Sequence, residues 1–336
     1  MGYTRQFSHS YTRNDIAQWR SHASLLMTEL IAAGWKYTGD TGQIDFSTVT
    51  TFGSNNTFAG YKIIEIDDAW AALGKRIILK LEFGWCHESM YSAYRVDNSM
   101  AIRLSIGTGT DGVGNLTGIV WSNSTTVYPS SQTGYNVGYA LSGNFYSYFA
   151  SNQDRGFYGV SYFNNGRTGA YDAGYVFNAC TLSFFIQRSI VDGVVTGDGF
   201  TAYIIANTNT SWATGGSNSC RWPGSGPANP NRTRIVGFSY SDVAPQTTTY
   251  PISTPARDDF PSIGNRVVVG PTYGLYPYIH IIPNLVTIPT GQVSEGATFN
   301  VETSPGMVTK FIMLGPGTGL CPDERGQYCS YAMIWE

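Results

Sequence analysis

Two stretches of alternating apolar and polar side chains constrain the fold of this chain more than any other feature. The alternation runs through residues 77–83 and returns in residues 100–106. A period of two residues is that of a β-strand with one buried face. We therefore expect two paired strands that share one continuous buried face. The side chains of this face are Leu79, Leu81, Phe83, Ile102, Leu104 and Ile106.

A glycine-rich run, GTGTDGVGNLTG, follows the second strand at residues 107–118. Glycine adopts positive φ angles without steric cost, so the run predicts a tight turn before a third strand over residues 119–121. The run also satisfies the G-x-G-x-x-G pattern of dinucleotide-binding loops. That pattern binds a pyrophosphate only where a helix follows, and the residues here favour β structure instead. We interpret the run as a turn.

Composition favours an all-β fold. Hydrophobic residues make up 42% of the 336 residues and can fill a core, while charged residues make up only 13%, about half their usual share. The chain is rich in tyrosine and glycine, which suit strands and turns. Strand signals recur between residues 144 and 335 without a fixed-period repeat. We expect an antiparallel, jelly-roll-like β-sandwich with a short N-terminal helical element.

One long helix is predicted near the start of the chain. Thr12 is the expected N-cap, with Asp15 three residues on, and Gly34 is placed to end the helix. Apolar residues recur between them at spacings of three and four. Two interpretations of this apolar stripe stay open, packing on the sheet or a helical seam between copies of the chain. The seam residues would be Ile16, Trp19, Leu26 and Leu30.

The length allows one large β domain or two ordinary ones. We place an N-terminal helix and attachment region at residues 1–74 and a main β-sandwich domain at residues 75–245. Residues 207–234, rich in Ser, Thr, Asn, Gly and Pro, are expected to form a long loop inserted in the main domain, and such loops are often contact sites. Residues 246–336 form a C-terminal β region, which belongs to the same sandwich or to a second one.

A short helical segment is expected over residues 67–74, capped by Asp67 and stopped by Gly74. Asp67 and Asp68 form a carboxylate pair, the kind of pair that acid–base catalysis uses. Adjacent residues diverge in direction, however, and an aspartate at a helix start is already explained by capping.

Several short sequence motifs, here called the shared words, resemble motifs of a known protein family. They are IILKLEF at residues 77–83, RLSI at residues 103–106, the glycine-rich run, Arg188-Ser189 with TGDGF at residues 196–200, and Phe311, Leu314 and Gly315 with residues 333–336. Together they resemble a family of tailed-bacteriophage virion structural proteins. The resemblance implies a particle component rather than a reaction. It implies a homo-oligomer, with a trimer favoured, assembled in the bacterial host cytoplasm with other virion proteins on the tail, baseplate, neck or head surface.

Two other classes of function stay open. One is a module of the particle that binds a host receptor or glycan, because exposed aromatic rings stack on sugars. Its candidate residues are Tyr158, Tyr162, Trp212 and Trp222, although tyrosine packs sheets and interfaces equally well. The other is a polysaccharide depolymerase, which needs two spaced carboxylates. Its candidates are Glu65, Asp67, Glu82 and Asp154.

Several partners and cofactors are not expected. A net charge of −3 with no basic stripe argues against nucleic acid. No run approaches the roughly 18 apolar residues of a membrane-spanning helix, and the first twenty residues do not form a secretory signal. Cys86-His87-Glu88 lacks the ligand spacing of a zinc site, so we expect no metal. We also expect no other cofactor and no enzyme activity. Among five cysteines, Cys321 and Cys329 are a candidate disulfide pair.

Overall fold

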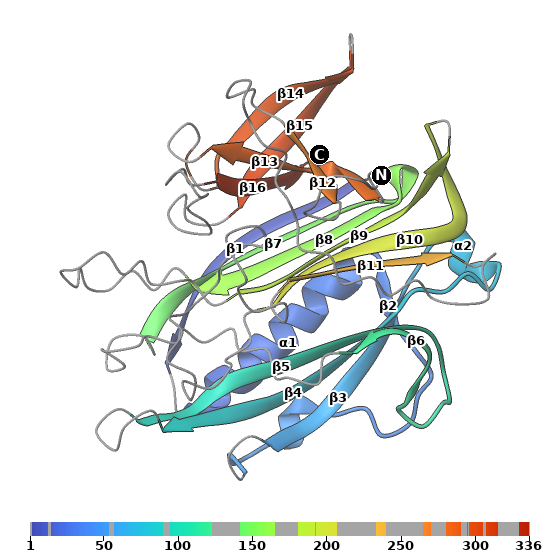
Figure 1. Cartoon of the computed structure of the whole chain (residues 1–336). Helices are drawn as coiled ribbons and strands as arrows, with labels where there is room; N and C mark the ends of the chain where they lie inside the picture. Colours follow the sequence, from blue (N-terminus) through green and yellow to red (C-terminus); the bar gives the residue numbers. More distant parts are fainter. Residues whose placement is uncertain are drawn as a thin grey trace.

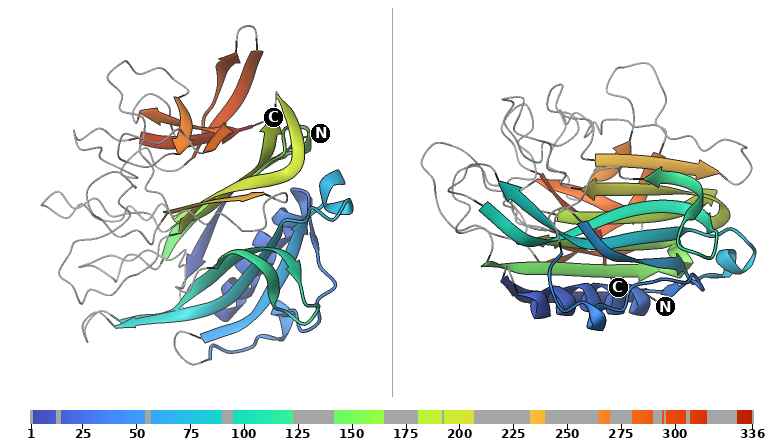
Figure 2. Two further views of the ribbon diagram at one scale, coloured as in Figure 1. Left: turned by 45° about the vertical axis from the view of Figure 1, so that its right-hand side comes forward. Right: turned by 90° about the horizontal axis from the view of Figure 1, so that it is seen from below.

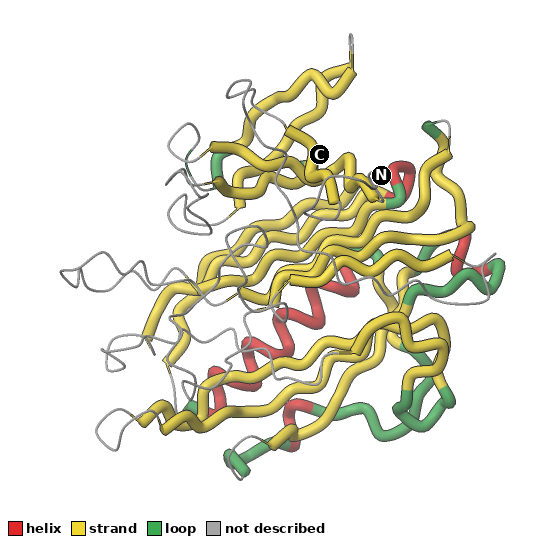
Figure 3. Tube along the Cα trace, in the orientation of Figure 1, coloured by secondary structure: helices red, strands yellow, loops and turns green. Residues whose placement is uncertain are grey.

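The computed structural model describes residues 2–12, 15–53, 57–89, 95–122, 142–164, 181–191, 193–206, 233–239, 265–269, 280–289, 294, 296–304, 307–314 and 329–335. Three antiparallel β-sheets, here called sheets A, B and C, dominate this part of the chain, together with one long helix (Figure 1, Figure 3). The expectation of an all-β fold with an N-terminal helical element is confirmed.

Sheet B contains the two strands that the alternating residues predict. Its order is β2 (Trp35–Tyr37), β3 (Thr57–Ile66), β4 (Ile78–Ser89), β5 (Arg95–Thr110) and β6 (Leu116–Ser122). Across β4 and β5, Leu79 pairs with Ile106, Leu81 with Leu104 and Phe83 with Ile102. All six side chains are 0% exposed. The predicted continuous face is therefore confirmed in its membership and its register.

Sheet A is built from strands that are more widely spread along the chain. Its order is β1 (Gly2–Thr12), β7 (Ser142–Asn152), β8 (Phe157–Asn164), β9 (Thr181–Val191), β10 (Val194–Ala206) and β11 (Thr233–Ser239). The first strand, β1, was not expected from the sequence. It pairs with β7 along its whole length, from Gly2 opposite Asn152 to Thr12 opposite Ser142.

Helix α1 (Ile16–Ala32) runs along one side of the two stacked sheets A and B, next to their edge strands β1 and β2 (Figure 2). Its buried side chains share one core with residues of both sheets, and the indole Nε1 of Trp19 donates to the carbonyl of Gly84 at 2.7 Å. The sheet-packing interpretation of the helix is thus confirmed. The seam interpretation is wrong because its residues are used within the chain: Trp19, Leu26 and Leu30 are buried, and Ile16 packs against the same core.

Sheet C covers the opposite face of sheet A (Figure 1). Its order is β12 (Asn265–Val269), β13 (His280–Pro289), β16 (Cys329–Ile334), β15 (Met307–Leu314) and β14 (Thr298–Ser304). The side chain of Asn284 donates to Gln187 of β9 at 2.8 Å. A Cβ on Gly159 would lie 3.0 Å from the sulfur of Met333, so the two sheets approach closely at this glycine.

The connectivity differs from a jelly roll. In sheets A and B, strands that follow one another in sequence from β2 to β6 and from β7 to β11 are neighbours in space, whereas a jelly roll passes repeatedly between its two sheets. The first 74 residues supply β1 to sheet A and β2 and β3 to sheet B, so they are an integral part of the core that these sheets share.

Two predicted helix caps need correction. The N-cap of α1 is Asp15, whose carboxylate accepts from the backbone N–H groups of Ala17 and Gln18, whereas Thr12 ends β1. The N-cap of the short helix α2 (Ala69–Ala72) is Asp68 rather than Asp67. In both cases the neighbouring candidate has another role, because Thr12 belongs to a strand and Asp67 pairs with Lys36.

Candidate functional site

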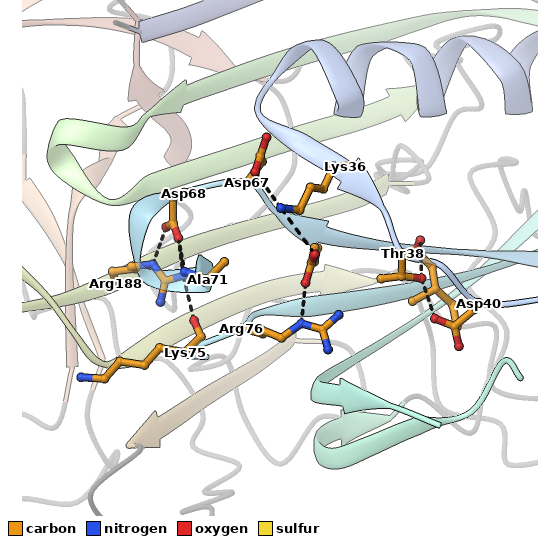
Figure 4. Close-up of polar contacts among 11 residues, drawn as sticks. Lys36, Thr38, Asp40, Asp67, Asp68, Ala71, Lys75, Arg76 and Arg188 are labelled. Atoms are coloured by element: carbon orange, nitrogen blue, oxygen red, sulfur yellow. Dashed lines mark hydrogen bonds and ion pairs between the residues drawn. The ribbon is translucent and has the colours of Figure 1, made fainter. Parts of the chain in front are cut away.

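A buried ion pair joins sheets A and B at the start of α2 (Figure 4). The guanidinium of Arg188, from β9, lies with Nε 2.6 Å and Nη2 2.9 Å from the two carboxylate oxygens of Asp68. Arg188 is 0% exposed and the side chain of Asp68 is 6% exposed. We call the contacts around this pair the Asp68–Arg188 junction.

The strand period places Arg188 inside the protein. Phe184 and Ile186 face the core, and Arg188 follows them at the next position of the same face. A buried guanidinium needs an opposite charge and hydrogen-bond acceptors because it leaves water. Asp68 supplies the charge, and the carbonyl of Lys75 accepts from Nη2 at 3.1 Å. The remaining nitrogen, Nη1, has no hydrogen-bond partner among the described residues, so Asp68 is the main compensation for the charge.

Asp68 in turn has several donors. One oxygen accepts from the backbone N–H of Ala71 at 2.9 Å and so caps α2, and the other accepts from the hydroxyl of Tyr158 at 3.1 Å. Burial, followed by the negative charge of Asp68, raises the pKa of Tyr158 far above its usual value of 10. The phenol therefore stays protonated and acts as a fixed donor. Both members of the ion pair are thus held in place by contacts within the protein.

The TGDG word packs on the outside of the same junction. The pairing of β9 with β10 shifts register between Val195 and Phe200, so these four residues form a bulge. A Cβ on Gly197 would lie 2.4 Å from the ring of Trp70, and the carboxylate of Asp198 lies 2.7 Å from Nζ of Lys75. The hydrogen bond and charge of Lys75 lower the pKa of Asp198. The bulge thus holds α2 against sheet A.

The carboxylates considered for glycoside hydrolysis are engaged in other contacts. Glu65 lies 2.5 Å from Nε of Arg76, and Lys36 bridges Glu65 and Asp67 at 3.6 and 2.9 Å (Figure 4). Glu82 forms a bidentate pair with Arg103, at 2.5 and 2.6 Å. The fourth candidate, Asp154, lies in the first turn of the short helix η2 (Gln153–Arg155).

The glycine-rich run turns the chain between β5 and β6, as expected, but only residues 111–115 lie outside the strands. The third strand begins at Leu116, earlier than the predicted residues 119–121. Gly112, Gly114 and Gly118 have positive φ angles. The backbone N–H of Gly114 donates to Asp40 at 3.1 Å, and its carbonyl accepts from Nζ of Lys80 at 2.8 Å. A Cβ on Gly114 would lie 2.1 Å from the hydroxyl oxygen of Tyr61, so the close approach requires glycine. The hairpin folds back over the outer face of sheet B.

The candidate recognition residues are not brought together as expected. Tyr158 is only 1% exposed because it faces the core, where its ring lies 5.9 Å from that of Trp35, so its assignment to a recognition surface is wrong. Tyr162 lies within β8, but its side chain is outside the described residues, as are Trp212 and Trp222.

The structure describes one cysteine of the candidate disulfide pair. Cys329 begins β16, whereas Cys321 lies outside the described residues, and so does any bond between them. Within the described ranges, no three histidine, cysteine, aspartate or glutamate side chains gather as a metal site would require. The same ranges contain no helix of the length and apolar character needed to cross a membrane.

The roles of Asp68 and Arg188 are not predicted from the sequence. Arg188 belongs to a shared word, and Asp68 lies beside a predicted helix cap. One local signal did exist. Arg188 continues the inward positions of an otherwise apolar strand, and a charge at such a position predicts a buried partner. Nothing local identifies that partner, which lies 120 residues earlier.

No family model, curated protein or solved structure matches the chain. The resemblance to virion structural proteins therefore depends on the sequence words alone. The structure adds the positions of these words, which lie on β4, β5, the β5–β6 hairpin and the β9–β10 pair. The Lys80–Gly114 contact lies within sheet B, and the Arg188–Asp68 contact joins β9 of sheet A to the start of α2.

Proposed function

We propose that the chain is a non-enzymatic structural component of a tailed-phage particle, where it assembles as a homo-oligomer on the tail, baseplate, neck or head surface. The observation that carries this proposal is the use of the shared words within the fold. Lys80 and Glu82 of the first word contact Gly114 and Arg103, which belong to two other words. These contacts lie within one chain, so the words specify the fold of the component and not a substrate site.

The two shared words that contain Arg188 and Asp198 support the proposal in the same way. Arg188 reaches Asp68 from β9, and Asp198 reaches Lys75 from the bulge in β10, so both words hold α2 in place. Each contact joins segments more than 100 residues apart. Residue patterns for catalysis would instead aim side chains at a space that a substrate can enter. The words therefore favour a scaffold over a reaction.

The proposal is tested on particles of the phage that encodes the chain. Particles purified by density-gradient centrifugation should contain the chain in a fixed copy number by quantitative mass spectrometry. Gold-labelled antibodies against the purified protein should mark one location on the particle. A non-structural protein encoded by the same phage is the control and should stay in the unsedimented lysate. Finding the chain only in the unsedimented lysate, together with the control protein, would contradict the proposal.

Activity assays separate the proposal from its enzymatic rival. The purified protein should release no reducing ends from host surface polysaccharide. Release that disappears in the Glu82→Ala or Asp154→Ala variant would overturn the non-enzymatic assignment. Asp154 is the more telling position, because Glu82 is also needed for its ion pair with Arg103.

A further inference from the structure

The outermost strands of the three sheets are protected to very different degrees. An outermost strand exposes unpaired backbone N–H and C=O groups, and proteins blunt such strands by making them short, bulged or charged. The edge strands within the described part of the chain are β1 and β11 in sheet A, β2 and β6 in sheet B, and β12 and β14 in sheet C. Comparing them shows which edge is left open.

Most of these edges carry a blunting feature. Strand β2 has only three residues, and β12 has five residues with a register shift against β13. Strands β6 and β14 have seven residues each and register shifts against their neighbours. Strand β11 is regular, but it also has seven residues and contacts β6 of the opposite sheet.

Strand β1 is neither short nor bulged, and its only basic residues are Arg5 and His9. It is eleven residues long, and all eleven are paired with β7 without a register shift. It contains neither proline nor lysine. Of the residues whose side chains are described, Gly2, Arg5, Gln6 and Ser8 are exposed and none is buried. Strand β1 is thus a long, flat edge, which is the kind that another strand pairs with readily.

We propose that β1 pairs antiparallel with β1 of a second copy of this chain, across a two-fold axis. Such a contact makes sheet A continuous through both copies. The same strand meets itself, so the contact is closed and leaves no further edge at this point. Figure 1 shows β1 at the side of sheet A away from β11, with α1 beneath it.

The charges of β1 suit a second copy. The strand has no carboxylate, and its basic residues are Arg5 and His9. An antiparallel pair centred on Gln6 or on Ser8 places Arg5 opposite Phe7 or Tyr11, whereas a pair centred on Phe7 would place Arg5 opposite His9. We therefore expect one of the first two registers. Like charges in opposite positions destabilise a strand pair, whereas aromatic and basic residues are compatible neighbours.

This inference rests on the proposed function, because it names the partner of an assembly component, but it can fail separately. Mass photometry and sedimentation equilibrium from about 0.1 to 100 µM, where specific pairs of ordinary affinity form, should show a dimer. The Ser8→Lys variant places a charge on the exposed edge and should weaken the dimer about tenfold. The matched control is Asn300→Lys, also exposed but on the bulged edge strand β14, which should leave the dimer unchanged.

Amide hydrogen exchange by NMR locates the contact. In the dimer, both sets of alternating β1 amides should be protected. In Ser8→Lys, the amides that face β7 should stay protected while those that face outward exchange freely, which separates dissociation from unfolding. A monomer at every concentration would overturn the inference, as would equal dimer affinity in Ser8→Lys and Asn300→Lys. Either result would leave the particle-labelling test of the proposed function intact.

Discussion

The inner face of the β4–β5 pair and the Asp68–Arg188 junction contribute to the same part of the protein through opposite chemistry. On β4 and β5, apolar side chains such as Leu81 and Leu104 are paired and completely buried. At the junction, Arg188 is just as deeply buried, but it contacts the carbonyl of Lys75 and the carboxylate of Asp68, which also caps α2. One region excludes charge, and the other depends on it.

The difference lies in how each region responds to change. Apolar burial is non-directional and is lost in proportion to the area removed. A buried ion pair gives little net stability compared with an apolar substitute, but removal of one partner leaves the other charged and buried. Apolar burial throughout the core, of which this face is one part, therefore supplies most of the favourable free energy of folding. The junction specifies where α2 sits between sheets A and B.

The largest expected effect comes from bringing a charge into the apolar region. Leu81→Asp should abolish soluble expression or particle incorporation, because its carboxylate would face Leu104 with no partner. Leu81→Ala should cost about 2–5 kcal/mol and still fold. Soluble yield and circular dichroism measure both. The matched control is Asn300→Asp, at an exposed strand position. Normal folding and assembly of Leu81→Asp would show that the β4–β5 pairing is wrong.

The second effect comes from removing charge at the junction. Asp68→Ala should lower the free energy of unfolding by about 3–5 kcal/mol, because Arg188 is left buried without its counter-ion. Asp45 is a matched control, since it also caps a short helix, η1 (Phe46–Thr48), but is exposed. Asp45→Ala should lower the free energy of unfolding much less, because it removes a cap but leaves no buried charge without its partner. Urea unfolding measures the loss of unfolding free energy in both variants. Equal losses would show that Asp68 acts only as a helix cap.

Asp40, a buried carboxylate whose hydrogen-bond partners are neutral, should have an effect on stability of intermediate size. Burial alone would raise the pKa of Asp40, but hydrogen bonds from Thr38, Thr110 and the backbone of Gly114 outweigh it and lower the pKa below its usual value. A depressed folded-state pKa means that Asp40 stabilises the protein above its unfolded pKa of about 4. This contribution is lost as the pH falls through the folded value.

Asp40→Asn tests this contribution. At pH 7 the free energy of unfolding of the wild type should exceed that of the variant by about 1–2 kcal/mol, because the variant lacks the charged acceptor. The gap should narrow as the pH falls below about 4. Urea unfolding across this range measures the gap, and a gap that does not change with pH would contradict the role of the ionised carboxylate.

The smallest effect is expected where an ion pair lies on the outer face of sheet B. The side chains of Glu82 and Arg103 are 17% and 30% exposed. Solvent and salt screen such pairs, so Arg103→Ala should cost about 1 kcal/mol or less. The loss should shrink further at high salt. A loss as large as that of Asp68→Ala would remove the contrast between outer and buried pairs.

The sequence predicts the apolar region well for a physical reason. Alternation is local, so the residues of β4 and β5 that face the core are identified by their own neighbours, and their register follows from matching the apolar faces. Strand β1 was missed because only Tyr3 and Phe7 of residues 2–8 pack towards the core, which is too sparse a pattern. Its pairing partner β7 begins at Ser142, far along the chain.

The junction could be predicted only in part. The presence of a helix start at residues 67–68 is a local property, and it was expected. Which aspartate caps it is not local, because both have the required side chain. The choice falls on Asp68, whose carboxylate also reaches Arg188 and Tyr158, while Asp67 faces Lys36. Tyr158 is buried because it faces the core beside Trp35, a contact that is also too distant along the chain to predict locally.

A double-mutant cycle on Asp68 and Arg188 tests most directly whether the shared words serve as an internal framework. Unfolding free energies are needed for wild type, Asp68→Ala, Arg188→Met and the double variant. We expect the double variant to lose about 2–3 kcal/mol less than the sum of the single losses, because no buried charge is left alone. Losses that add to within about 0.5 kcal/mol would contradict the junction and the structural role of the words that form it.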